Sequence, residues 1–319
     1  MTQKKVRTRT AVLGALVALS MAGCAGSPGP SEEFLAEDVS ARVLSAVRAL
    51  DYPFEDDPAY AVRASNLQTR LINDCVAAQG IPVPSVADLP LEPASVTVSP
   101  SRLWLVPGDD YGVSAALYDP TVLAQLRTEA EAHDTPGLAA AETAAYDQAV
   151  YGPENERIEL PVEDGGTVSI PVGGCFGEAT EVMYGVDAET YERTYAEVPR
   201  MQTVLTELTS DDDVRARMSD WSSCMGEAGY RASQPDDLYR VMSDWIAGVV
   251  DGTTLVGAVA EAERSLAAAD VDCRTQSGFG TVVSERFLEI AEAEIAAKEG
   301  VVQEYRTMIE HAQASLGDR

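Results

Sequence analysis

Apolar positions recur at helical spacing along most of the chain, so the sequence predicts a mostly α-helical fold. Helix starts are marked by acidic residues or by a Pro at the first helical position, and helix ends by Gly. The predicted helices span residues 37–50, 57–79, 119–133, 135–152, 175–184, 188–208, 210–229, 235–245, 255–273 and 284–316.

Two other patterns interrupt the helices. Residues 157–160 and 167–172 alternate between apolar and polar on either side of an acidic, Gly-containing turn at 163–166, which predicts a small β-hairpin. Residues 82–110 are rich in Pro, Ser and Val and have no helical period. We expect extended segments and loops there, as part of an irregular insert.

The last predicted helix carries an apolar stripe with a seven-residue period, which favours long, shallow-angle packing against another helix. Lys298 and Gly300 weaken the seam that an independent coiled coil would need, so we expect a partner within the same chain rather than a second molecule. The stripe consists of Leu288, Ile295, Val302, Ile309 and Leu316.

The first 23 residues have the form of a secretory signal. A basic leader precedes an apolar run that ends in Ala22-Gly23-Cys24, although Met21 stands where a lipoprotein processing site usually has Leu. We expect lipidation (palmitate) of Cys24; the alternative is an ordinary signal, with Cys24 trimmed away or free. The predicted organisation is a signal at 1–23, a Pro-containing flexible tether at 24–36 and an extracytoplasmic domain at 37–319.

Net charge narrows the classes of partner. Four of the 23 basic residues lie in the leader and none of the 52 acidic ones does, which leaves about −33 after residue 23. Such a charge disfavours nucleic acid and anionic lipid head groups, because both would be repelled. It also keeps an exposed protein soluble, and we prefer that explanation of the acidity.

A cysteine motif occurs twice. Cys75 and Cys224 are each followed by Gly five residues later, by Ile81 or Tyr230, and by Asp-Leu at matching distance. Four cysteines allow three pairings. The simplest arrangement is two related units, 37–186 and 187–319, each stapled by a disulfide, Cys75–Cys175 and Cys224–Cys273. Crossed pairings, or free or metal-binding thiols, are the alternatives; no Cys-x-x-Cys spacing supports a metal site.

These motifs carry a resemblance. The signal ending in Cys24, the Cys-Met-x-x-x-Gly-Tyr run at 224–230, Asp272-Cys273, the Gly-Gly-Cys-Phe-Gly-Glu-Ala run at 173–179 and the acidic last helix resemble uncharacterised actinobacterial surface lipoproteins. The resemblance covers most of the chain from Cys75 onward and is weakest over 90–153. It implies location and disulfides, and it brings no activity or catalytic residues.

Little points to catalysis. His133 and His311 are the two histidines, both on charged parts of predicted helices, and no Gly-x-Ser-x-Gly elbow or phosphate-binding loop occurs. We therefore predict no catalytic residues, no cofactor and no metal site. The acidic runs at 109–110, 163–164 and 211–213 could bind a cation or act as an acid–base pair, but helix capping and solvated loops are the simpler explanation.

Aromatic residues gather in the insert. Trp104, Tyr111 and Tyr118 are the candidate binding residues, because aromatic faces can stack on a sugar or peptide, although such residues also fill seams between loops and helices. Tyr146 and Tyr151 lie further along. Trp221 and Trp245 are expected in the core.

The sequence thus predicts a non-enzymatic binding protein of the cell envelope, anchored to the membrane through Cys24, with an envelope protein or glycan as partner. One alternative is a solute-binding lipoprotein serving a transporter, although those are usually built on parallel sheets. The other is an envelope hydrolase that uses two carboxylates.

Overall fold

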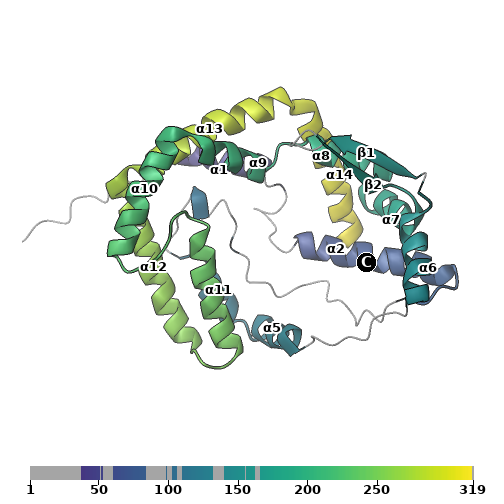
Figure 1. Cartoon of the computed structure of the whole chain (residues 1–319), viewed down its shortest axis with the longest axis horizontal. Coiled ribbons are helices and arrows are strands. Elements are labelled where there is room, and N and C mark those ends of the chain that lie inside the picture. The colour runs from purple at the N-terminus through teal and green to yellow at the C-terminus, as the bar shows by residue number, and fades with distance from the viewer. Residues whose placement is uncertain are drawn as a thin grey trace, which may run out of the picture. The chain divides into compact units, whose positions relative to one another are not determined.

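The computed structural model describes residues 37–50, 52, 60–83, 98, 103–105, 110–131, 140–154, 156–161 and 166–317. This part of the chain is mostly helical with a small antiparallel hairpin, which confirms the predicted fold class (Figure 1). In chain order the elements are α1 (Glu37–Leu50), α2 (Tyr60–Ala78), α4 (Val113–Tyr118), α5 (Pro120–Glu131), α6 (Ala140–Tyr151), β1 (Arg157–Pro161), β2 (Thr167–Pro171), α7 (Gly174–Tyr184), α8 (Ala188–Glu197), α9 (Met201–Ser210), α10 (Asp212–Glu227), α11 (Asp237–Val250), α12 (Val256–Ser277), α13 (Phe279–Ala297) and α14 (Glu299–Gly317).

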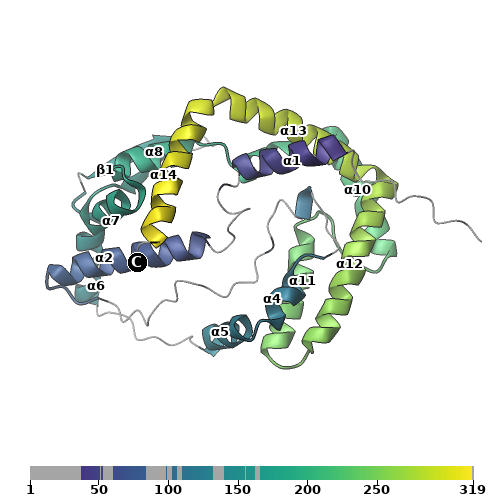
Figure 2. The same cartoon turned by 180° about the vertical axis from the view of Figure 1, so that it is seen from behind.

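The larger core forms around α12 and α13. α13 runs alongside α1 and α9, and α12 packs on α10 and α4 (Figures 1 and 2). Trp221, Phe279 and Phe287 are fully buried there, and Trp245 is partly buried against the same core. Burying one such side chain contributes about 1.5–3 kcal/mol to stability.

A smaller core lies where α14 packs against α2, α7 and α8. Tyr60, Met183 and Ile309 are among its buried side chains. Beside it, Val76, Val150 and Cys175 form a third cluster that links α2, α6 and α7.

The cores do not follow the predicted division into units 37–186 and 187–319. α1 and α4 come from the first unit yet pack into the larger core with α12 and α13. α14 comes from the second unit and packs with α2 and α7. The two predicted units are therefore interleaved in space.

The hairpin confirms the prediction from alternation. β1 pairs with β2 in a register that places Ile158 opposite Ile170 and Leu160 opposite Val168. Ile158 and Leu160 are buried while their neighbours on β1 are exposed, as alternation requires.

Aspartates start two of the helices. The Asp187 side chain accepts a hydrogen bond from the backbone N–H of Thr190 at the start of α8. Asp211 accepts from Asp213 and Val214 at the start of α10, which accounts for one acidic run by capping. Ser210, predicted to open that helix, instead ends α9.

The single helix predicted over 188–208 is wrong. The chain forms α8 and α9, separated by Val198, Pro199 and Arg200. Pro199 has no N–H to donate and disfavours helical backbone in the residue before it. Val198 accordingly adopts an extended conformation with φ −62° and ψ 134°.

The single helix predicted over 284–316 is also two helices. α13 begins earlier than predicted, at Phe279, directly after the α12 cap at Gly278. Lys298 leaves the helical conformation, and α14 continues in another direction (Figure 2). The apolar stripe packs within the chain as expected, but Leu288 faces the larger core and Ile309 the smaller one.

Both predicted disulfides are present. Cys75 pairs with Cys175 and Cys224 with Cys273, at Cα–Cα distances of 5.7 and 5.5 Å. These separations are normal for disulfides.

The duplicated motif has the same local structure in both copies. Two residues after the last residue of α2 and of α10 stands a Gly of positive φ, Gly80 and Gly229 respectively. The next residue donates its backbone N–H to a carbonyl of the last helical turn, from Ile81 to Val76 and from Tyr230 to Met225. The partner cysteines differ, since Cys175 lies in the first turn of α7 and the other near the end of α12. The two disulfides are therefore alike in local structure only at Cys75 and Cys224, and not at their partner cysteines.

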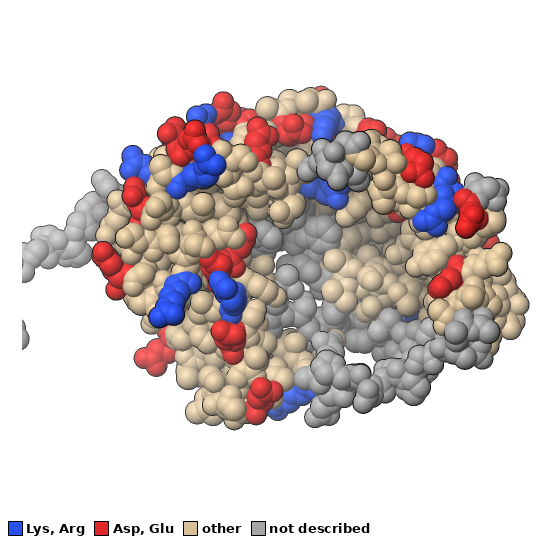
Figure 3. Space-filling view, viewed as in Figure 1, with Lys and Arg blue, Asp and Glu red and all other residues tan. Residues whose placement is uncertain are grey.

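Acidic side chains are spread over the visible face, with fewer basic ones between them (Figure 3). None of the described helices combines the length and the apolar character that crossing a membrane requires.

Candidate binding site

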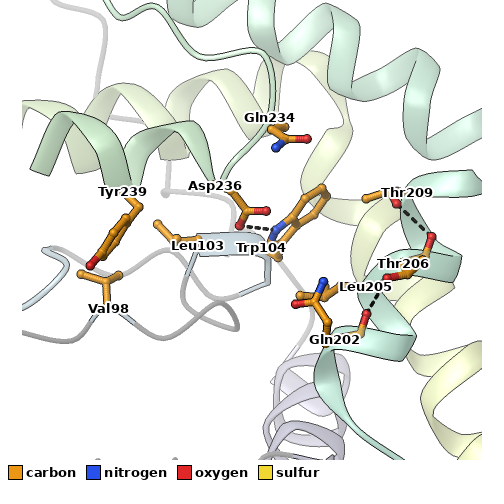
Figure 4. Close-up of a pocket in the computed structure, with 10 residues that line it drawn as sticks. All are labelled: Val98, Leu103, Trp104, Gln202, Leu205, Thr206, Thr209, Gln234, Asp236 and Tyr239. Atoms are coloured by element: carbon orange, nitrogen blue, oxygen red, sulfur yellow. Dashed lines mark hydrogen bonds between the residues drawn. The ribbon is translucent and has the colours of Figure 1, made fainter. Parts of the chain in front are cut away.

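A cavity of about 540 Å³ lies beside Trp104, one of the residues that the sequence singled out. The turn at 103–105 forms one wall, α9 the second, and the segment that leads into α11 the third (Figure 4). The volume is in the range of small-molecule sites. The described residues that line it are Val98, Leu103, Trp104, Gln202, Leu205, Thr206, Thr209, Gln234, Asp236 and Tyr239.

A hydrogen bond fixes the centre of the cavity wall. The indole Nε1 of Trp104 donates to Oδ1 of Asp236 at 2.8 Å (Figure 4). Asp236 is exposed, and its second oxygen makes no hydrogen bond to any described residue. That oxygen can accept a hydrogen bond from a ligand hydroxyl or amide.

The rim is polar and largely uncharged. Gln202 and Gln234 are exposed, and neither side-chain amide has a hydrogen-bond partner among the described residues. Each amide offers both donors and an acceptor to a ligand. The hydroxyls of Thr206 and Thr209 instead bond to backbone carbonyls within α9. Tyr239 is 48% exposed and presents an aromatic face.

A buried ionic network holds the wall in place. Arg274 of α12 donates to the backbone carbonyls of Trp104, at 2.7 Å, and Leu103. Asp270, one turn earlier, pairs with Arg274 and accepts from the indole Nε1 of Trp221, both at 2.8 Å. Because every charge is matched by a hydrogen-bonding partner, the network orders the turn at 103–105 rather than leaving it a free loop.

The same network reaches Tyr111. Its hydroxyl donates to Asp270 Oδ2 at 2.8 Å. Burial and the neighbouring Asp270 carboxylate raise the pKa of Tyr111 above its ordinary value, so the phenol stays protonated and remains a donor.

Glu263 caps α4 from a distant helix. Its carboxylate accepts backbone N–H groups from Tyr111, Val113 and Ser114 at 2.8–3.0 Å. Gly112, the residue before α4, has no side chain to do this. A fully buried carboxylate at the positive end of the helix therefore replaces a local cap.

The stacking role predicted for two of the aromatic candidates needs correction. Trp104 and Tyr111 are only 1% and 2% exposed, because the α12 network draws both into the larger core. Their rings cannot serve as open stacking surfaces, although Trp104 remains part of the cavity wall. Tyr118 is 61% exposed and is not among the residues that line this cavity.

The predicted lipidation site, one of the two histidines and residues of two acidic runs lie outside the described part of the chain. These residues are Cys24, His133, Asp109, Glu163 and Asp164. His311 is exposed, with Nδ1 2.8 Å from the Met183 carbonyl oxygen. In the part of the chain that the structure describes, no group of three or more His, Cys, Asp or Glu residues could hold a metal ion.

Sequence reasoning missed most of the cavity. Asp236 was recognised only as part of a helix start, and Gln202, Gln234 and Tyr239 were not singled out. Such polar residues form no periodic pattern or motif in the sequence. They line one cavity only because three segments far apart in the chain come together in the fold.

Comparisons of the chain with protein-family models, curated proteins and solved structures found no match.

Proposed function

We propose that the protein is a lipoprotein of the extracytoplasmic face of the cell membrane, anchored through Cys24, whose cavity beside Trp104 binds an uncharged polar envelope ligand such as a glycan unit. The location rests on the leader and the Ala22-Gly23-Cys24 site. The two disulfides support it, because such bonds persist in oxidising compartments.

The observation that carries the binding role is the cavity itself. It combines the hydrogen-bonded Trp104–Asp236 pair, an exposed Tyr and two amides that have no hydrogen-bond partner among the described residues, and no cationic side chain lines its described surface. Amides and a carboxylate oxygen match the hydroxyls of a sugar, and Tyr239 offers an aromatic face for its apolar side. A non-enzymatic role agrees with the isolation of Asp236, the only carboxylate among the described residues that line the cavity.

Binding is tested by titrating the soluble domain, residues 37–319, with fragments of the native envelope glycans, using calorimetry. Gln234→Ala and Tyr239→Ala should each weaken binding about five-fold, the equivalent of roughly 1 kcal/mol for one lost contact. Gln276→Ala is the matched control, since Gln276 is exposed on α12 and does not line the cavity. Equal binding by all variants, or no binding of any fragment, would refute the role of the cavity.

The anchor is tested separately in cells. Cys24→Ser should move the protein from the membrane fraction to the soluble fraction, and the N-terminal peptide of the native protein should carry the mass of acyl chains on Cys24. An N-terminal peptide without acyl groups would refute the anchor and leave the binding test unaffected. Binding of single sugars or amino acids, with none to polymeric fragments, would favour solute capture for a transporter instead.

A further inference from the structure

A second groove, of about 720 Å³, lies between the hairpin, α8 and the linker 198–200. It shares no lining residue with the cavity beside Trp104. Lys298, at the break between α13 and α14, also lines it.

One wall of this groove is an incompletely covered apolar sheet face. The register places Ile158 and Leu160 of β1 on the same face as Ile170 and Val168 of β2. The β1 pair is buried, but Val168 is 42% exposed. The apolar side chains of β1 on this face are therefore buried, whereas those of β2 leave apolar surface exposed to the groove.

The lining of the groove also includes two cationic residues, Arg200 and Lys298. The Arg200 guanidinium stacks over the Tyr195 ring, 4.6 Å from its centroid, and Tyr195 is itself stacked on Tyr191. No carboxylate among the described residues pairs with Arg200. Lys298 pairs with Glu294 at 3.2 Å.

Arg200 is one of several described arginines that form no ion pair with a described carboxylate, and it is set apart by lining a groove beside exposed apolar surface. Stacking on Tyr195 holds the guanidinium in a fixed place while its N–H donors remain available. Glu192 also lines the groove, and its negative charge disfavours a ligand with two negative charges.

We propose that this groove binds a fatty-acid-like monocarboxylate, with its carboxylate on Arg200 near Lys298 and its alkyl chain along Val168 and Ile170. Arg and a carboxylate form charge-assisted, bidentate hydrogen bonds. The alkyl chain would cover the exposed face of β2 and gain from leaving water. A ligand with a single negative charge is attracted by Arg200, and Glu192 repels it less than it would repel a doubly charged ligand.

The test uses the full chain with Cys24→Ser, which removes only the lipid attachment site, and dodecanoate labelled with ¹³C at the carboxyl carbon, below its micelle concentration. We expect saturable one-to-one binding by calorimetry and a shifted ¹³C carboxyl resonance. Arg200→Gln should weaken binding about tenfold or more, because it removes the charged partner. Val168→Glu places a charge on the apolar wall at an exposed position and should abolish binding.

Two controls separate this site from adsorption to the surface. Arg193→Gln removes an exposed Arg on α8 that pairs with Glu189 and does not line the groove, so affinity should stay within about two-fold. The dodecanoate methyl ester tests the charge and should bind about tenfold more weakly than the acid. Equal affinity across Arg200→Gln, Arg193→Gln and wild type, equal binding of the ester, or no saturable binding would overturn the proposal.

Discussion

Asp270 and Arg274 form a salt bridge 2.8 Å long in the larger core, with neither side chain exposed to solvent. They lie one turn apart on α12, so the helix itself sets their spacing. Their other partners come from the turn at 103–105, from Tyr111 and from Trp221, and together these contacts join the insert to the second disulfide unit.

Removing the positive partner should be strongly destabilising. Arg274→Met leaves the Asp270 charge buried without a counterion and takes the donors away from two backbone carbonyls, which should cost about 3–5 kcal/mol of unfolding free energy. Urea unfolding followed by tryptophan fluorescence measures the change. Arg264→Met, at an exposed position on the same helix, is the control and should stay within about 0.5 kcal/mol. Similar values for both variants would mean that the salt bridge contributes no special stability.

The cap that Glu263 provides can be tested locally. Glu263→Gln replaces one acceptor oxygen by an amide N–H₂, which would face a backbone donor at the start of α4. We expect a loss of about 1–3 kcal/mol and faster hydrogen exchange at residues 111–118. Glu261→Gln, exposed on the same helix, should leave exchange there unchanged. Unchanged exchange in Glu263→Gln as well would argue against capping by α12.

The disulfides should stabilise different regions. Replacing Cys224 and Cys273 by Ala opens a link across a sequence separation of 49 in the larger core and should cost about 4 kcal/mol. Replacing Cys75 and Cys175 by Ala should raise hydrogen exchange mainly in α2 and α7, which that disulfide joins. If replacing Cys75 and Cys175 raised hydrogen exchange in α10 and α12 as much as in α2 and α7, the two disulfides would not stabilise separate regions.

Glu192 should make stability fall as pH rises. Burial raises its pKa, so the folded protein holds this proton to higher pH than the unfolded chain does. The contribution to stability is fully present below the unfolded pKa of about 4.3 and is lost as pH rises through the folded pKa. The difference between the Tm of Glu192→Gln and that of wild type should therefore grow in favour of Glu192→Gln as pH rises above about 4.3. A constant difference in Tm would contradict this.

Asp187 provides a comparison of opposite sign. The hydrogen bond from the Thr190 backbone N–H holds the pKa of Asp187 below its ordinary value. Its stabilising contribution is present above the unfolded pKa of about 3.9 and is lost as pH falls through the folded pKa. The Tm deficit of Asp187→Ala should thus be largest near neutral pH and shrink in acid. A deficit that grew in acid would rule out the capping explanation.

The sequence by itself determined the features that depend on neighbouring residues. Apolar periodicity and helix-start signals placed α1 and the hairpin correctly, and α8 starts at residue 188 as predicted. The disulfide pairing that the repeated cysteine motif favoured is the one present, and Gly80 and Gly229 follow their helices in the same way. Where local rules failed, a local cause was visible, such as Pro199 between α8 and α9.

Only the tertiary structure decided which residues meet. Glu263, Asp270 and Arg274 look like ordinary surface charges of a helix, and their burial arises because the insert folds back over α12. The same contacts turned Trp104 and Tyr111 from candidate stacking surfaces into core residues. The cavity and the Arg200 groove likewise join segments far apart in the chain, and the long-range packing that joins them leaves no periodic signal in the sequence.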